Sequence, residues 1–154
     1  MLQIAARTAI TLCIAAFVCS CTCWGVPRGF FQELPAQRYA EFESYDFETQ
    51  YKIYICGQQC HEPGDVGLAF PFARKGSRIV EPLKSKLEST DNDETVFDIV
   101  LVFRAMSDMG TYDVAGDKAL MSVLREKVRA IRDPSWRRTT EEHLQAILKT
   151  SSKS

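Results

Sequence analysis

Residues 95–109, with the sequence TVFDIVLVFRAMSDM, decide the fold class of this chain. Their apolar side chains would lie nearly all round a helix, which is typical of the most buried helix of a domain. The five consecutive apolar residues 99–103 would also suit a buried strand, but the length of the whole stretch favours a helix. Gly110 follows, and glycine is the residue that most often ends a helix. We therefore predict a central helix over 95–109.

Helical spacing also governs the residues before this stretch. Residues 44–60 place aromatic and aliphatic side chains at helical intervals, and we predict a helix there although the segment YKIYI is also β-prone. We also predict a short helix over 67–75. The next one extends to Glu88, and Pro82 within it requires either a kink or a start later than Ser77.

Capping residues mark further helix starts. A side-chain oxygen that accepts a hydrogen bond from the first turn is favoured there, and proline suits the first helical position. One amphipathic helix ends near Ile131, and the last helix carries Leu144, Ile147 and Leu148 on its apolar face. The starts predicted in this way are Asp91 with Glu94, Asp113 or Gly116, Asp133 before Pro134, and Thr139 with Glu142.

These segments predict an all-α fold of about five short helices. Short links between consecutive helices favour antiparallel hairpins. The run from Phe72 to Leu148 contains a glycine, an Ile/Val-x-x-Leu helix, a charged turn, a long apolar helix and Asp-capped helices, and in this order it resembles HEAT-type helical hairpins. An irregular helical bundle fits the same pattern. The resemblance implies a binding role on a concave surface rather than catalysis.

The composition is that of an ordinary folded domain. Among the 154 residues, 45% are apolar and 25% are charged, which excludes an intrinsically disordered chain and a multi-span membrane protein. The formal net charge of −1 provides no strong positive field for nucleic acid. We therefore expect one domain without a nucleic-acid partner.

The amino terminus resembles an export signal. Arg7 precedes twelve uncharged residues, 8–19, whose helix would span about 18 Å, too short for the roughly 30 Å core of a bilayer. Val18-Cys19-Ser20-Cys21 resembles the lipobox of bacterial lipoproteins, although Cys19 departs from the small residue preferred there. The resemblance implies cleavage before Cys21 and acylation of that cysteine. If the lipoprotein sorting of enteric bacteria applies, Thr22 after the cysteine is not an inner-membrane retention signal, and the resemblance then implies the outer membrane with the domain facing the periplasm.

Secretion without acylation and an uncleaved anchor are the alternatives. The aromatic residues Trp24, Phe30 and Phe31 either insert among lipid headgroups or pack on the domain. The sequence therefore divides into 1–20 as signal peptide, 21–40 as lipidated amino terminus and flexible tether, 41–149 as helical domain and 150–154 as disordered tail.

Four cysteines, Cys21, Cys23, Cys56 and Cys60, follow the predicted cleavage into an oxidising compartment. Cys56 and Cys60 share a face of a helix that the glycine between them could break, so Cys56–Cys60 is a possible disulfide. Buried thiols and pairing with Cys23 remain open. His61 turns off the face that the two cysteines share, and zinc needs three or four ligands. We therefore predict no metal site and no cofactor.

A small cell-envelope hydrolase is the alternative function. It would use either Cys56, Cys60 and His61 as a thiolate–histidine set, or the cluster Asp108, Asp113 and Asp117 for acid–base work. Helix capping by these aspartates is the simpler interpretation. A dense positive cluster either faces anionic lipid or an acidic partner, or forms a solvated helix face; it comprises Arg125, Lys127, Arg129, Arg132, Arg137 and Arg138.

The sequence thus predicts an exported, membrane-anchored lipoprotein with a non-catalytic helical domain of the interaction type. Its partners would be membrane lipid, through acylated Cys21, and a protein of the periplasm, in an adaptor-like or immunity-like role.

Overall fold

The computed structural model describes residue 23, residues 25–61 and residues 63–151. Every regular element in these residues is a helix, which confirms the predicted all-α class. This part of the chain contains seven α-helices rather than about five. Their bounds are α1 Pro35–Ser44, α2 Phe47–Gln59, α3 Ala69–Ala73, α4 Val80–Ser89, α5 Asp93–Met109, α6 Lys118–Ala130 and α7 Pro134–Ser151, with short 3-10 turns at Phe30–Gln32, Val66–Leu68 and Gly76–Ile79.

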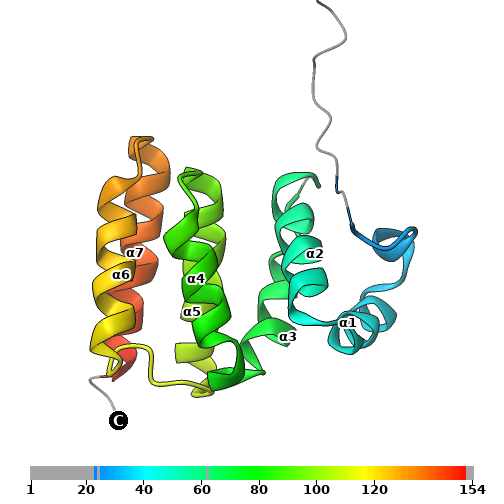
Figure 1. The fold of residues 1–154 in the computed structure, drawn as a ribbon, viewed down its shortest axis with the longest axis horizontal. Coiled ribbons are helices and arrows are strands. Elements are labelled where there is room, and N and C mark those ends of the chain that lie inside the picture. Colours follow the sequence, from blue (N-terminus) through cyan, green and yellow to red (C-terminus); the bar gives the residue numbers. More distant parts are fainter. Residues whose placement is uncertain (1–22, 24, 62, 152–154) are drawn as a thin grey trace, which may run out of the picture.

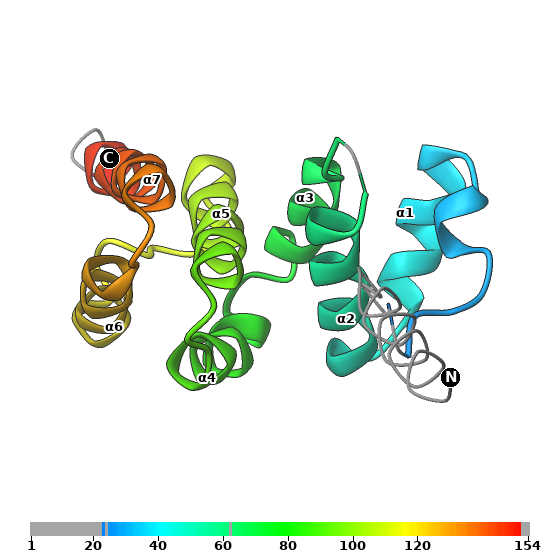
Figure 2. The same cartoon turned by 90° about the horizontal axis from the view of Figure 1, so that it is seen from above.

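The helices form two rows. Figure 1 shows most of them running in the same direction or its opposite, and Figure 2 shows α1, α3, α5 and α7 in one row and α2, α4 and α6 in the other. Residues 90–92 join α4 to α5, and residues 131–133 join α6 to α7. Links this short make each pair an antiparallel hairpin, as predicted. The fold is therefore an all-α bundle built from stacked helical hairpins.

The helix α5 is the centre of the fold, as the sequence predicts. It contacts α2, α3, α4, α6 and α7. Its side chains are buried on several faces, and Ile99, Val100 and Phe103 have no exposed surface. The helix ends at Gly110, whose φ of 65° is the left-handed conformation that glycine adopts without strain.

An aromatic cluster joins the first three helices. Phe72 of α3 is fully buried, and its ring centroid lies 5.5 Å from that of Phe42, 5.7 Å from that of Phe47 and 5.8 Å from that of Tyr54. Burying such a side chain contributes roughly 1.5–3 kcal/mol. The cluster therefore fixes α1 and α2 against the short α3.

The predicted flexible tether over 21–40 is wrong from Phe30 onward. Phe30 is 1% exposed and packs edge-on against Phe31, with 5.1 Å between ring centroids. Pro35 begins α1, because a proline at the first helical position gives up no intrahelical hydrogen bond. The domain thus starts before residue 41, and these two phenylalanines pack on it. Cys21 and Trp24 lie outside the described residues.

Two predicted helix starts are displaced. Asn92, not Asp91, is the N-cap of α5, and its side chain accepts a hydrogen bond from the Thr95 N–H. Asp117, rather than Asp113 or Gly116, caps α6. In both cases a neighbouring residue of the same chemical kind takes the role, since the sequence pattern locates a cap only to within a few residues.

The capping box predicted at Thr139 is also wrong. Asp133 and Pro134 start α7 as predicted, with Asp133 Oδ1 accepting from the Trp136 N–H, and the helix continues without a break to Ser151. Thr139 lies inside it and donates its hydroxyl to the Ser135 carbonyl. By contrast, α4 starts at Val80, so of the two alternatives that Pro82 left open, a kink or a start later than Ser77, the later start is correct. No helix in the described part of the chain is long and apolar enough to cross a membrane.

Candidate functional site

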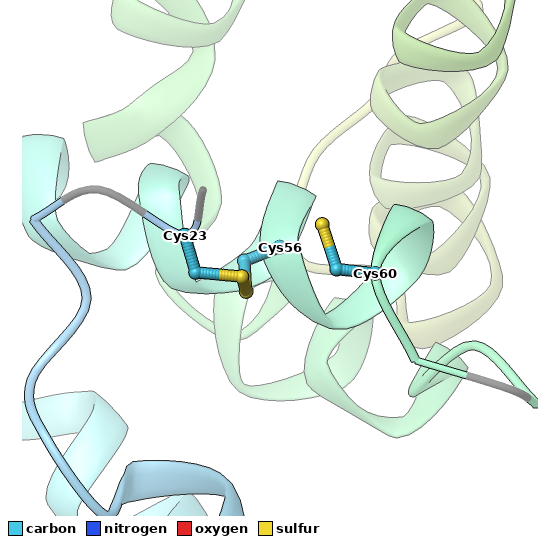
Figure 3. Close-up of side chains that lie close together, drawn as sticks. All are labelled: Cys23, Cys56 and Cys60. Carbon is cyan, nitrogen blue, oxygen red and sulfur yellow. A yellow bond between two sulfur atoms is a disulfide. The ribbon is translucent and has the colours of Figure 1, made fainter. Parts of the chain in front are cut away.

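Cys23, from the amino-terminal segment, meets Cys56 and Cys60 at the carboxyl end of α2 (Figure 3). Cys23, in the amino-terminal segment, forms a disulfide with Cys56, with 5.4 Å between the two Cα atoms. Cys60, the residue at which α2 ends, keeps its thiol. All three sulfur atoms lie within 4.8 Å of one another. A thiol is therefore within reach of an existing disulfide.

The possible Cys56–Cys60 disulfide is wrong. The helix α2 continues through Gln59, and the Cys60 backbone N–H donates to the Cys56 carbonyl at 2.9 Å, as in a regular turn. The two Cα–Cβ bonds then run parallel along one face, which disfavours a bond between the sulfurs. Cys23 comes from outside the helix and is free of this constraint, so the pairing that the sequence left open is the one formed.

Gly57 does not break α2, contrary to the expectation from sequence. A Cβ placed on it would lie 2.9 Å from Leu68 Cδ1 and 3.1 Å from Phe31 Cε1. The glycine is therefore needed for close packing on this face of the helix. Because α2 stays intact here, Cys56 and Cys60 keep their positions one turn apart.

Hydrogen bonds from side-chain amides hold the last turn of α2 in place. Gln58 Nε2 donates to the Asp65 carbonyl at 2.7 Å. Gln59 Nε2 donates to Asp98 Oδ2 at 2.9 Å and to Thr95 Oγ1 at 3.1 Å, both on α5. The three-cysteine cluster thus stands on a turn that is tied to the central helix.

Asp98 is a residue that sequence reasoning missed. Its side chain is only 3% exposed, and this burial raises its pKa to about 7, while the hydrogen bond from Gln59 acts in the opposite direction. The Tyr54 hydroxyl donates to its backbone carbonyl at 2.7 Å. The available signal was the one acid within the otherwise apolar residues 96–103. A buried carboxyl needs polar partners, so its position there marks a polar contact inside the core.

The three-cysteine cluster is the one group of His, Cys, Asp and Glu side chains in the described residues whose spacing suits a metal ion. Metal ions bind thiolates, and the disulfide occupies two of the three sulfurs. The oxidised cluster offers one thiolate, fewer than zinc requires. What this arrangement can do chemically is therefore sulfur exchange.

The structure does not assemble the two candidate hydrolase sets. Cys56 is in the disulfide, and the His61 ring packs on Phe31 with 4.1 Å between centroids. Among the aspartates, Asp108 pairs with Arg104 at 2.6 Å, Asp113 accepts from the Gly116 N–H, and Asp117 accepts from the Leu120 N–H. The last of these hydrogen bonds is the first cause of the lowered pKa of Asp117, and the Tyr112 hydroxyl, which donates to the same carboxylate, is the second.

The predicted positive cluster is partly used in holding loops. Lys127 donates to the Thr90 carbonyl at 2.9 Å, and the Arg137 guanidinium donates to the Ile131 carbonyl. Arg125, Arg129, Arg132 and Arg138 are exposed. The number of basic side chains available at the surface is therefore smaller than the sequence suggests.

A groove of about 400 Å³ that the sequence did not indicate lies along α3, α5 and α7. Its apolar lining includes Val66 and Phe70, which are 57% and 52% exposed, together with Phe97 and Leu101. Its polar lining is Arg104, Asp108 and His143. Residues this far apart in sequence carry no local pattern that would reveal a shared groove.

The polar residues of the groove give it little net charge. Arg104 and Asp108 form an ion pair and offset each other. Burial, followed by the positive charge of Arg104, lowers the pKa of His143 and so disfavours the charged form of its ring. The groove therefore suits an apolar, uncharged group better than an ion.

Comparison of this chain with family models, with curated proteins and with solved structures finds no match.

Proposed function

We propose that this protein is an exported lipoprotein, held at a membrane through acylated Cys21, whose helical domain binds a protein partner through the groove along α3, α5 and α7. The observation that carries the first part is the Cys23–Cys56 disulfide, because structural disulfides are typical of exported proteins. The lipobox-like residues 18–21 supply the anchor. Two or three acyl chains on one residue hold a small protein stably at a bilayer.

The position of the disulfide fits this arrangement. Cys23 is two residues after Cys21, so the disulfide ties the chain to α2 almost at the point of acylation. A force on the anchor would reach the folded domain through the disulfide. The segment between Cys23 and Phe30 would then carry little of the load.

The groove supports the second part of the proposal. Phe70 and Val66 expose more than half of their surface beside Phe97 and Leu101, and exposed apolar residues that adjoin one another are typical of interaction sites. The near-neutral lining favours a partner segment that presents apolar side chains. The amphipathic helix of another protein is a common ligand for a groove between helices.

The anchor is tested by the intact mass of the protein purified from the membranes of its own cells. Wild type should begin at Cys21 and carry the added mass of acyl groups, whereas Cys21→Ser should remain unprocessed and unacylated. Cys19→Ser is the matched control and should be processed like wild type. An unacylated wild-type protein would contradict the anchor.

The groove is tested by crosslinking in the same membranes. Phe70→Ser should lose the crosslinked partners that wild type retains. Leu34→Ser is the control, because Leu34 is 68% exposed and does not line the groove. Equal crosslinking by both variants would contradict partner binding in the groove, whatever the outcome of the mass measurement.

A further inference from the structure

The three-cysteine cluster has the components of a thiol–disulfide exchange reaction. A thiolate breaks a disulfide by attacking one of its sulfurs and forming a bond to it while the other sulfur leaves. Cys60 Sγ lies within 4.8 Å of both sulfurs of the Cys23–Cys56 bond. No other reactant is needed, since the attacking thiol and the disulfide belong to the same chain.

We propose that Cys60 exchanges with Cys56 for the bond to Cys23. The Cys60 thiol loses its proton, its sulfur forms a bond to Cys23 Sγ, and the Cys23–Cys56 bond breaks with its electron pair leaving on Cys56. Cys56 then takes up a proton. One disulfide and one thiol are present before and after, so no oxidant or reductant is consumed.

The Cys60 thiolate attacks the sulfur of Cys23 and not that of Cys56, because the product of attack on Cys56 is unfavourable. That product would join Cys56 to Cys60 within one helical turn, where the parallel Cα–Cβ bonds disfavour a disulfide. Attack on Cys23 only shifts the amino-terminal segment by one turn along the same face of α2. Cys60 lies at the end of α2, with φ −112° and ψ 0°, so its backbone is not constrained by a following turn of helix.

The two forms differ in the thiol that they leave. In the structure the remaining thiol is that of Cys60, which is partly exposed. After exchange it is that of Cys56, which is 5% exposed. A buried neutral thiol behaves as a small apolar group and is inert, whereas a thiol at the surface can react with other thiols and oxidants. Exchange therefore gives the protein a form with an accessible thiol and a form in which it is protected.

The test is disulfide mapping of the full chain after oxidation with oxidised glutathione and its removal. Samples held at pH 6, 7 and 8 are quenched with acid, alkylated with N-ethylmaleimide and analysed by fragmentation mass spectrometry. The label should move from Cys60 to Cys56 as the Cys23–Cys60 bond forms. Because the thiolate fraction of a cysteine rises with pH, exchange should be slowest at pH 6 and fastest at pH 8.

Two variants complete the test. Cys60→Ser should keep the Cys23–Cys56 bond and show no label on Cys56 at any pH. Cys56→Ser should form a Cys23–Cys60 disulfide under the same oxidation. The proposal is overturned if the wild-type label stays on Cys60 at pH 8, if its movement does not depend on pH, or if Cys56→Ser leaves both Cys23 and Cys60 labelled. Acylation of Cys21 is detected on a separate residue in the same spectra, so failure of the exchange is distinct from failure of the proposed anchor.

Discussion

The side-chain amide of Gln59 donates a hydrogen bond to the Asp98 carboxylate at 2.9 Å and thereby joins the last residue of α2 to the middle of α5. Asp98 is almost fully buried, and this hydrogen bond compensates part of its lost hydration. The carboxyl therefore links the ionisation of one side chain to the stability of the α2–α5 interface.

We expect stability to fall as pH rises through the range in which Asp98 ionises. Its pKa is about 7 in the folded protein, against an ordinary value of 3.8, so between these values the folded protein holds a proton that the unfolded chain has released. The stability present below about pH 4 is then lost toward pH 7, by at most about 1.4 kcal/mol per pH unit. Urea denaturation across this range measures the loss.

Asp98→Asn should remove that loss. The difference between the two proteins, the free energy of unfolding of the variant minus that of wild type, should increase from pH 4 to pH 7 and then remain level. Asp113→Asn is the control, because Asp113 is exposed. Parallel stability curves for Asp98→Asn and wild type would contradict the raised pKa.

The Cys23–Cys56 disulfide should be a major source of stability. It joins residues separated by 33 positions, and closing a loop of that size in the unfolded chain stabilises the folded state by about 3–4 kcal/mol. Cys23→Ser should lose this amount in urea denaturation, whereas Cys60→Ser should lose much less. Equal losses in the two variants would show that the cluster acts through packing rather than through the bond.

Two phenylalanines of α3 should differ in how much stability their truncation removes. Phe72 is fully buried among aromatic rings, so Phe72→Ala should cost about 3–5 kcal/mol. Phe70, two residues away, is 52% exposed in the groove, so Phe70→Ala should change the free energy of unfolding little. Similar losses in both variants, measured by urea denaturation, would mean that Phe70 is part of the core and not of a binding surface.

The sequence was most informative where the signal is local. Residues 95–109 carry their own evidence of a buried helix in an apolar pattern and a terminal glycine, and Asp133 with Pro134 marks a helix start through the chemistry of two adjacent residues. The tether predicted over 21–40 overran the start of α1 at Pro35, because a proline can end one element or begin another, and only the buried Phe30 and the packing of α1 decide between them.

The candidate site was less predictable, because its parts are distant in sequence. Local spacing favoured Cys56 with Cys60, whereas the bond to Cys23 depends on the amino-terminal segment folding back onto α2. The groove likewise joins Phe70 to His143 through the packing of three helices. Neither the Cys23–Cys56 disulfide nor the groove can be predicted from the periodicity of a single segment.

The N-cap of α5 offers a direct comparison between sequence pattern and structure. Asn92 accepts a hydrogen bond from the Thr95 N–H at 2.9 Å, whereas the side chain of the neighbouring Asp91 is fully exposed and lies 3.8 Å from Lys127. Asn92→Ala should therefore cost about 1 kcal/mol of unfolding free energy, because it leaves a backbone donor of the first turn without its partner. Asn92→Asp should retain most of the stability, since aspartate caps equally well. Asp91→Ala should change little, and a loss confined to Asp91→Ala in urea denaturation would place the start of the central helix one residue earlier, where the sequence pattern predicts it.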